Sequence, residues 1–404
     1  MGDIAVLGAG MVGIATALAL QARGHDCVVI DRAPPGRETS YGNAGFIQAE
    51  AVEPYALPGN PLALLRLAFG WKNAVALDWT SLPRQAPALA AYWRASLPPT
   101  LETVIPLWRQ LVAEALPAHA PLIAASGAEA LIRRDGYWQA HHASRTLDEA
   151  IVEATRRRER YGLAFTLADG AQMARAEPGL RAPLAGAIHW PAPWTCLSPG
   201  ELVAAYARLF VQRGGRILVG DAGSLRQQGA GWQVCGLPVE QVVIALGPWS
   251  PDLLKPLGYD VPMVRKRGYH RHLAGDGGLR RPMLLADHSV VLAPMRDGLR
   301  ITTGAELSTG APRAHPRQLA RGEAVARALL DLGAPVEALP WSGTRPCLPG
   351  MLPLVAPASR HRGLWLHFGH GHQGFTLGPA TADRLARAID GEAGAIAGLA
   401  GGVR

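Results

Sequence analysis

The sequence predicts an α/β fold in which a discontinuous domain of βαβ type is interrupted by a lobe with a mixed sheet. The chain opens with a strand, a glycine loop, a helix and a second strand over residues 4–31, which is the start of a βαβ unit. Residues 289–303 instead form two apolar runs around Asp297-Gly298, a strong signal for an antiparallel hairpin. A chain of 404 residues is long enough for two such units.

Between these two signals, periodicity and turn residues place the other elements. Residues 51–125 are rich in proline and tryptophan, contain a helical segment at 101–116, and look like an inserted lobe. Ser198 and Pro199 suit the N-cap and the first turn of a helix. The other expected elements are a strand at 136–140, helices at 147–161 and 199–213, a strand at 216–219, paired strands within 232–243, a helix at 318–332, a strand at 364–368 and a helix at 379–390.

These elements divide the chain into two units. The discontinuous domain takes residues 1–50, 145–250 and 340–404, and the lobe takes residues 51–144 and 251–339. With 49% hydrophobic and 18% charged residues, the composition is that of a globular protein and not of a disordered one.

Charge, cysteine content and hydropathy narrow the function classes. A net charge of +8 suits an anionic substrate or a membrane surface, or is an ordinary basic solvated surface. The absence of a basic run with interleaved aromatic residues argues against nucleic-acid binding. No stretch reaches the ~18 apolar residues of a membrane span, and a strand that starts at residue 4 leaves no room for a signal peptide. The scattered cysteines favour a reducing cytoplasm without disulfides or structural metal; peripheral contact with the inner membrane stays open.

The first glycine loop has the spacing of a dinucleotide site in a Rossmann-like domain. Gly8 permits the tight turn out of the strand, Gly10 lets the backbone approach a pyrophosphate, and Gly13 lets the helix pack close to the strand. The phosphates would lie at the positive end of the helix that begins near Met11 and Val12. The alternative is a tight strand–helix turn that binds no ligand.

The second strand ends in Asp31, where an acidic side chain can bond the hydroxyls of an adenosine ribose. Asp31 argues against NADP, which prefers a basic residue at this place, although the neighbouring Arg32 keeps that alternative open. The loop that follows, 38–45, is built mostly of small residues that let the backbone lie close to a flat ring. The loop residues expected beside the cofactor are Thr39, Ser40, Asn43, Ala44 and Gly45.

Two later stretches complete a predicted flavin site. One follows a strand near 242–244 and includes Ala245, Leu246, Gly247 and Trp249. The other is a glycine loop before the last helix, and its expected cofactor residues are Gly371, His372, Gln373, Gly374, Phe375 and Thr376. Each stretch alone is weak evidence, but their order and contents together indicate an FAD-dependent amine or amino-acid oxidoreductase.

The start of the last helix has an expected electrostatic role. Backbone N–H groups after Gly374 would stabilise the negative charge that arrives near flavin N1 and O2. Thr376 or Gly378 would cap this helix, with Pro379 in its first turn. His370 would line the flavin ring or satisfy a loop carbonyl.

The three stretches resemble the D-amino-acid oxidase superfamily of flavoproteins, and within it the bacterial D-amino-acid dehydrogenases, over essentially the whole chain. The run 243–258, Arg267-Gly268-Tyr269, Gly343-Thr344-Arg345-Pro346 and Gly369-His370-Gly371 carry the resemblance. It implies a glutathione-reductase-like FAD-binding domain and an amino-acid substrate. Sarcosine-oxidase relatives attach flavin to a cysteine, and because Cys347 is not at that position we expect non-covalent FAD.

Some positions depart from the subgroup's pattern where a substrate would lie. The subgroup usually has a lysine in place of Arg267, an acidic residue in place of Gly350, and no imidazoles at His270 and His372. We therefore expect His270 and His372 to tune substrate choice, and the substrate to carry a polar or anionic feature beyond its α-carboxylate. The alternative for His372 is a residue of a solvent-exposed loop.

The resemblance also implies which residues hold the substrate. Arg345 lies in the motif that clamps the substrate carboxylate, and its planar guanidinium can form two parallel charge-assisted bonds. The alternative for Arg345 is a structural ion pair. Tyr269 would add a hydroxyl to the same carboxylate, or would be a half-buried strand tyrosine.

Together these features predict an FAD-dependent amino-acid dehydrogenase or oxidase. It would convert a D-amino acid to an imine, which water hydrolyses to a 2-oxo acid. Alternatives are a dehydrogenase for a cyclic or N-substituted amino acid (hydroxy-D-proline, sarcosine or an opine) and a flavin-binding subunit of a hetero-oligomer that is inert without its partners. The electron acceptor is oxygen or a quinone of the respiratory chain, and the sequence does not distinguish the two.

Overall fold

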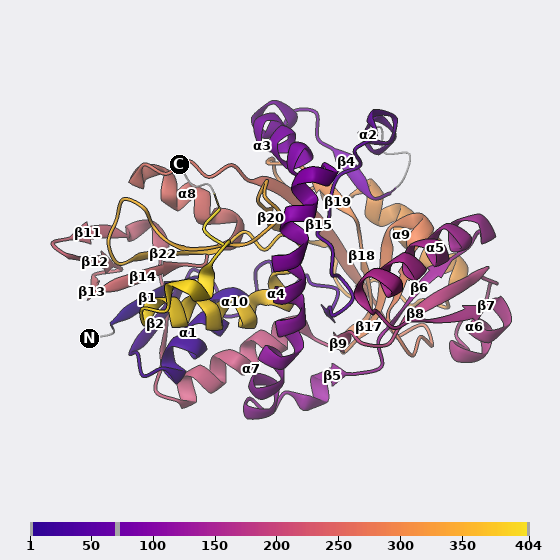
Figure 1. Cartoon of the computed structure of the whole chain (residues 1–404). Coiled ribbons are helices and arrows are strands. Elements are labelled where there is room, and N and C mark those ends of the chain that lie inside the picture. The colour runs from indigo at the N-terminus through magenta and orange to yellow at the C-terminus, as the bar shows by residue number, and fades with distance from the viewer. Residues whose placement is uncertain (1–2, 69–72, 402–404) are drawn as a thin grey trace.

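The computed structural model describes residues 3–68 and 73–401, and this part of the chain forms two large sheets that lie side by side (Figure 1). The first is a six-stranded sheet that is parallel except for β21 at one edge. Its order is β10 (Arg216–Val219), β2 (Cys27–Asp31), β1 (Ile4–Leu7), β14 (Gln241–Ile244), β22 (Leu364–Phe368) and β21 (Leu354–Pro357). The predicted βαβ start is therefore confirmed.

Strand alternation in this sheet fills a core on each face. Ile4 and Val6 of β1 pack into a helical layer, whereas Ala5 and Leu7 pack against a three-stranded meander with Trp232 at its centre. The helices of the first layer are α1 (Met11–Ala22), α7 (Pro199–Gln212) and α10 (Gly374–Ile389). The meander is β11 (Arg226–Gln228), β12 (Gly231–Val234) and β13 (Leu237–Val239).

The second sheet is mixed, as the sequence predicts for the lobe. Its order is β4 (Val75–Leu77), β19 (Ala305–Leu307), β15 (Val264–Leu273), β18 (Gly298–Thr302), β17 (Val290–Met295), β16 (Met283–Leu285), β6 (Tyr137–His141), β8 (Gly186–Trp190) and β7 (Thr166–Asp169), with β20 (Trp341–Cys347) paired to β15. The predicted hairpin is β17–β18, turning at Asp297-Gly298. Its inner side chains pack against helix α9 (Arg317–Leu329).

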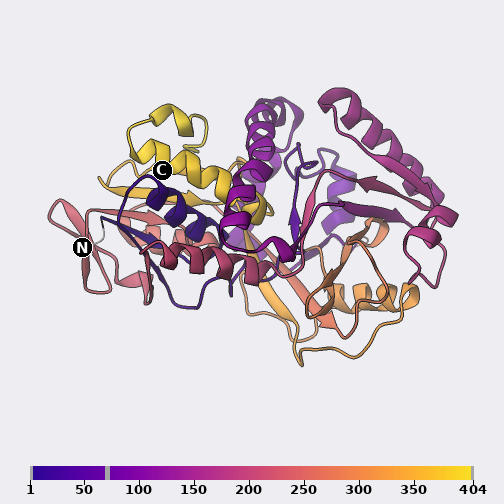
Figure 2. The same ribbon diagram turned by 90° about the horizontal axis from the view of Figure 1, so that it is seen from below.

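Helix α4 (Pro98–Ala125) stands between the two sheets, as both views show (Figures 1 and 2). Its buried Trp108, Leu111 and Ala115 join the core of the six-stranded sheet. The sequence predicted a helix at 101–116, and the structure extends it through Pro117 and Pro121 to Ala125. Burial of an apolar stripe compensates for the backbone bonds that those prolines remove.

Helix α10 also contradicts its predicted start. It begins at Gly374 and contains Pro379, which was expected in its first turn. Proline has no N–H, so the carbonyl oxygen of Phe375, four residues earlier, loses its helical partner. The buried His119 of α4 takes that place, because its Nε2 lies 2.9 Å from the Phe375 oxygen. The contact between α4 and α10 thus accommodates the proline.

The remaining elements complete the two units. They are helices α2 (Pro61–Ala68), α3 (Leu82–Ala95), α5 (Ser144–Tyr161), α6 (Gly170–Ala176) and α8 (Ser250–Leu254), and a small sheet of β3 (Phe46–Ile47), β9 (Trp194–Cys196) and β5 (Ile132–Arg133). Ser198 precedes α7 in an extended conformation, but its side chain makes no capping hydrogen bond, so that detail of the prediction is wrong. In the described residues no helix is both long and apolar enough to cross a membrane.

Sheet membership bears on the proposed domain boundaries. Strands β7 and β8 lie within 145–250, which the sequence assigned to the discontinuous domain, yet they pair in the ten-stranded sheet with β6. Strand β20 joins that sheet too, and helix α4 packs on the other unit. We therefore propose boundaries that place 145–190 with the lobe and most of α4 with the six-stranded sheet.

Candidate active site

A cavity of about 560 Å³ lies between the two sheets. The six-stranded sheet contributes the glycine loop, the 245–249 turn and the start of α10, and the lobe contributes β15, β20 and loop 302–303. Most residues that the sequence assigned to the cofactor are on the cavity wall. They are Gly8, Gly10, Met11, Val12, Asp31, Arg32, Thr39, Ser40, Asn43, Ala44, Ala245, Leu246, Gly247, Trp249, Gly371, His372, Gly374 and Phe375.

The first glycine loop fits a dinucleotide closely. Gly8 has φ +113°, and a Cβ there would lie 2.5 Å from the Ala245 oxygen, so the turn requires glycine. A Cβ on Gly13 would lie 1.8 Å from the Gly8 oxygen, which shows the close packing of α1 on β1. A Cβ on Gly10 would approach only Ser40 Oγ, at 3.3 Å. The protein therefore leaves open space above Gly10, where a pyrophosphate would lie at the N-terminus of α1.

Asp31 and Arg32 have different surroundings. Asp31 accepts hydrogen bonds from the backbone N–H groups of Ala9 at 2.6 Å and Ala33 at 3.0 Å, which fixes its carboxylate at the cavity wall. Arg32 is exposed, pairs with Glu38 at 2.8 Å, and stacks 4.3 Å above the Trp249 ring. An arginine already paired in this way is poorly placed to bind the phosphate of NADP, so the geometry favours FAD.

Buried groups from the lobe hold loop 38–45 in place. Arg300 donates to the Tyr41 oxygen at 2.9 Å and also to the Asn43 oxygen, and its Nε donates to His272. The ring of Trp341 covers Gly42 so closely that a Cβ there would lie 1.8 Å from it. Two elements of the other unit thus set the position of the loop beside the predicted ring site.

Four of the expected cofactor residues lie behind the cavity wall. Gly13 packs on Gly8, and a Cβ on Gly45 would lie 2.4 Å from the Cys196 oxygen, so both glycines serve chain packing. Thr376 Oγ1 accepts from the Gln48 N–H at 3.2 Å, and Gln373 Nε2 donates to the Gln48 side chain at 2.5 Å. These four residues support the residues of the cavity wall but do not themselves line the cavity.

The start of α10 faces the cavity through Gly374 and Phe375. Because the helix begins at Gly374, its first free N–H groups are nearer to the cavity than a helix starting at Pro379 would place them. His370 also lines the wall, bonds Thr381 Oγ1 at 2.9 Å, and has its pKa lowered to about 3 by burial. His370 is therefore a neutral ring at physiological pH.

Arg345 lies on the cavity wall, and its guanidinium donates to two backbone carbonyls: Gly304 at 3.1 Å and Thr303 at 3.4 Å. Within residues 3–68 and 73–401, no carboxylate lies within 4.0 Å of it. Burial lowers its pKa without removing its charge. Five N–H donors with two carbonyl partners leave donors for an anion in the cavity, so an internal ion pair is not its role.

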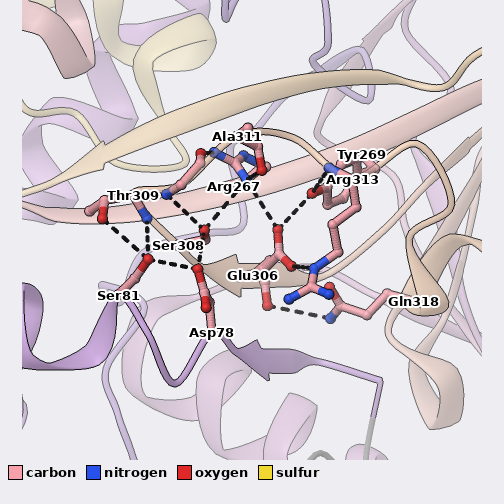
Figure 3. A network of polar contacts seen from close by, with 12 residues as sticks. Asp78, Ser81, Arg267, Tyr269, Glu306, Ser308, Thr309, Ala311, Arg313 and Gln318 are labelled. Atoms are coloured by element: carbon pink, nitrogen blue, oxygen red, sulfur yellow. Dashed lines mark hydrogen bonds and ion pairs between the residues drawn. The ribbon is translucent and has the colours of Figure 1, made fainter.

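Tyr269 is among the residues that line the cavity, but its hydroxyl is bonded to Glu306 and not directed to Arg345. The hydroxyl donates to the buried Glu306 at 2.6 Å and accepts from the Arg313 N–H at 3.1 Å (Figure 3). Lys266, and not Tyr269, is the β15 residue opposite Arg345, and residues three apart on a strand point to opposite faces. Arg267 shares the Tyr269 face, so its departure from the subgroup's pattern does not touch the cavity.

The two histidines differ. His372 lines the cavity beside Tyr55, with ring centroids 4.8 Å apart, and burial together with the charges of Arg345 and Lys266 holds its pKa well below the usual value. It is thus a neutral imidazole and not a cation. His270 is stacked behind Trp341 at 4.8 Å and is not among the residues of the cavity wall, so the geometry gives no support to its expected contact with substrate.

Sequence reasoning missed several residues of the wall. Tyr55 bonds the Gln48 side chain at 3.1 Å, and both residues line the cavity together with Trp341. None of them belongs to a recognisable motif. Lys266, whose amine lies 4.1 Å from the centroid of the Tyr92 ring, could have been found from strand alternation next to Arg267.

Comparisons with known proteins agree with this geometry. A family model described as FAD dependent oxidoreductase matches residues 3–388. The chain is 32% identical to D-amino acid dehydrogenase 2 of Ralstonia nicotianae, with 98% of each chain covered. It is 26% identical to a D-amino-acid oxidase of Bradyrhizobium diazoefficiens, covering 96% of this chain and 95% of the other.

A solved structure shows the same fold. Iminodiacetate oxidase from Chelativorans sp. BNC1 superposes with a TM-score of 0.71 at 21% identity, over 96% of this chain and 95% of the other. The chain belongs to the family of FAD-dependent oxidoreductases that includes the D-amino-acid oxidases and dehydrogenases, and it is a flavoenzyme that acts on amino acids.

Proposed function

We propose that this chain oxidises the Cα–N bond of a D-amino acid with non-covalently bound FAD. The observation that carries the proposal is Arg345, a guanidinium on the cavity wall whose partners are two carbonyls and whose surroundings, in the described part of the chain, lack a carboxylate. The relatives named as D-amino acid dehydrogenases support the D configuration.

The residues present would hold FAD along the whole cavity. The α1 N-terminus and Gly10 would take the pyrophosphate, Asp31 would take the ribose, and loop 38–45 with the start of α10 would border the ring. When bound, FAD accepts a hydride equivalent from the substrate's Cα. Cys347 is buried outside the cavity wall, and burial raises the pKa of its thiol, which supports non-covalent binding.

The chain's own groups would orient the substrate. Arg345 would clamp the α-carboxylate in two parallel bonds, so that Cα–H has one direction in the cavity. The neutral His372 and the Tyr55 hydroxyl would offer hydrogen bonds to the rest of the molecule. As the hydride equivalent leaves Cα and the amine nitrogen loses a proton, a C=N bond forms; water then converts the imine to a 2-oxo acid and ammonia.

The alternative substrates that the sequence left open are also compatible with this proposal. A cyclic or N-substituted amino acid would use the same carboxylate clamp and would release an amine instead of ammonia. The electron acceptor, oxygen or a quinone, and any partner subunit or membrane contact are open parts of the proposal.

A substrate screen tests the function. Purified protein is mixed anaerobically with D- and L-amino acids, sarcosine and hydroxy-D-proline while flavin absorbance is followed, and turnover is measured with an artificial electron acceptor. We expect bleaching by D-amino acids and release of free FAD by acid. Flavin retained on the denatured chain would contradict non-covalent binding, and bleaching by the L series alone would contradict the D configuration.

Gly10→Val tests the cofactor site. A valine there meets little protein but fills the space of the pyrophosphate, so we expect a folded protein without flavin. The measurement is flavin content after dialysis against FAD, with thermal unfolding to verify the fold. Gly394→Ala, at an exposed position with open space around it, is the matched control and should keep its flavin. Normal FAD content in Gly10→Val would place the pyrophosphate elsewhere.

A further inference from the structure

Strands β15 and β20 bring a second basic side chain to the face of Arg345. Lys266 is the residue directly opposite Arg345 in this antiparallel pair, and directly opposite residues point to the same side of a sheet. The guanidinium leans over Gly268, where a Cβ would lie 2.5 Å from Arg345 Nη2. The absence of a side chain at Gly268 therefore lets the guanidinium lie flat along the same surface as Lys266.

Neither of these cations has a carboxylate partner in the described part of the chain. Lys266 is only 7% exposed, and among the described residues no carboxylate lies within 4.0 Å of its amine. Its amine lies over the face of the Tyr92 ring, 4.1 Å from the ring centroid. The corresponding charge on Arg345 meets two neutral carbonyls. Buried charges are normally paired, so two unpaired cations side by side indicate a ligand that brings negative charge.

A small hollow beside the Tyr92 ring, on which the Lys266 amine rests, shares part of its wall with the main cavity. This hollow of about 10 Å³, enough for one water, is bordered by Tyr55, Tyr92, Cys347 and His372. Tyr55 and His372 also line the main cavity, so they form a common wall between Arg345 and the ring on which Lys266 rests. A carboxylate is larger than one water, so its entry requires a shift of the wall, where Tyr55 is 43% exposed.

We propose that the preferred substrate is an amino acid with two carboxylates, one on Arg345 and the second directed past His372 and Tyr55 toward Lys266. This inference rests on the proposed function and names its substrate class. The second carboxylate belongs to the side chain, as in D-aspartate and D-glutamate, or to a substituent on nitrogen, as in iminodiacetate. An anion at this place would also pair with the Lys266 charge, which burial and Arg345 otherwise disfavour.

The test uses substrates that differ in one charge. In wild-type holoenzyme, kcat/KM is measured for D-aspartate against D-asparagine, D-glutamate against D-glutamine, and iminodiacetate against sarcosine. We expect kcat/KM to be about ten- to a hundredfold higher for the dicarboxylate in at least one pair. This ratio corresponds to the usual free-energy contribution of one charge-assisted hydrogen bond. The pair with the largest ratio tells whether the second carboxylate is on the side chain or on nitrogen.

Lys266→Met removes the amine and keeps most of the stem. We expect the dicarboxylate preference to fall about ten- to a hundredfold, while kcat/KM for D-asparagine changes less than about threefold. Lys255→Met, at an exposed position, is the control and should leave the ratio unchanged. Equal losses for both members of a pair, or a wild-type preference for the amides, would overturn the inference and leave the proposed function standing.

A binding measurement covers the case in which Lys266→Met does not fold. Malonate and succinate are titrated against acetate and propionate with wild-type holoenzyme, and the flavin absorbance reports occupancy. We expect the dicarboxylates to bind at least about tenfold more tightly. Equal affinities would contradict the second-carboxylate site, whereas failure of every amino acid to bleach the flavin would contradict the proposed function itself.

Discussion

Two neighbouring basic residues of strand β15, Lys266 and Arg267, have different electrostatic surroundings. On the cavity face, Lys266 lies opposite Arg345, and neither has a carboxylate within 4.0 Å in the described residues. On the other face, Arg267 meets the buried Glu306 at 3.4 Å and donates to the Gly310 and Ala311 oxygens (Figure 3). Residues adjacent in the sequence thus enter two different electrostatic environments, because successive strand side chains alternate between faces.

The comparison of the two faces distinguishes charges that the protein itself compensates from charges that we propose are compensated by a ligand. On the far face the protein supplies the compensating anion and fills the surroundings with Tyr269, Arg313 and Ser308, so the network is complete without a ligand. On the cavity face the described residues supply no such anion, and Arg345 borders open space. Buried cations without an internal partner are therefore a better guide to this binding site than the motif that surrounds them.

Glu306→Gln should produce the largest effect, and on stability only. It leaves Arg267 buried without its anion, which costs about 3–5 kcal/mol in the free energy of unfolding. Urea unfolding of holoenzyme measures the loss, and kcat/KM of the folded variant should stay within a few-fold of wild type. Glu201→Ala, which removes an exposed pair with Arg296, is the control and should cost less than about 1 kcal/mol. A stable Glu306→Gln with impaired catalysis would place this network in the active site.

Arg345→Lys should give the converse result. Lysine keeps the charge and loses the planar fork, so the substrate can pivot, and kcat/KM should fall about ten- to a hundredfold, equivalent to roughly 1.5–3 kcal/mol. Flavin content and unfolding midpoint should change little, because residues 3–68 and 73–401 supply no carboxylate for this side chain. Arg296→Lys on the surface is the matched control. Near-normal kinetics would show that another group clamps the carboxylate.

Tyr269→Phe should have the smallest effect of the three. It removes one hydrogen bond to a buried carboxylate and one acceptor for the Arg313 N–H, which together are worth about 1.5 kcal/mol of stability. KM and kcat should be unchanged, because the hydroxyl faces away from Arg345. A raised KM with unchanged stability would restore the carboxylate-binding role that the sequence suggested for this tyrosine.

The local parts of the fold could be predicted from the sequence. The glycine loop, strands β1, β2 and β14, and hairpin β17–β18 depend on contiguous residues whose spacing is itself the signal. The motif around Arg345 and the stretches that line the cavity were found for the same reason. Gly8 and Gly13 also have their predicted packing roles, since a side chain at either would collide with backbone.

Only the tertiary structure decided the features that depend on a partner distant in the chain. Helix α4 continues past Pro117 and Pro121 because its apolar stripe is buried against the six-stranded unit, and Pro379 fits inside α10 because His119 bonds the freed carbonyl. Strands β7 and β8 join the lobe because their pairing partner is β6.

The arrangement of the site also depends on partners that are distant in the chain. The spacing of residues in the sequence indicates which residues of β15 share a face. Only the register between β15 and β20 shows that Lys266, and not Tyr269, lies opposite Arg345. Trp341 lies between His270 and the cavity, so His270 does not line it. Tyr55 of the inserted segment does line the cavity, although it belongs to no motif. The sequence by itself determined the cofactor class, because the glycine loop depends on local geometry, and it predicted Arg345 as the clamp; the charges around the cavity depend on which distant strands pair.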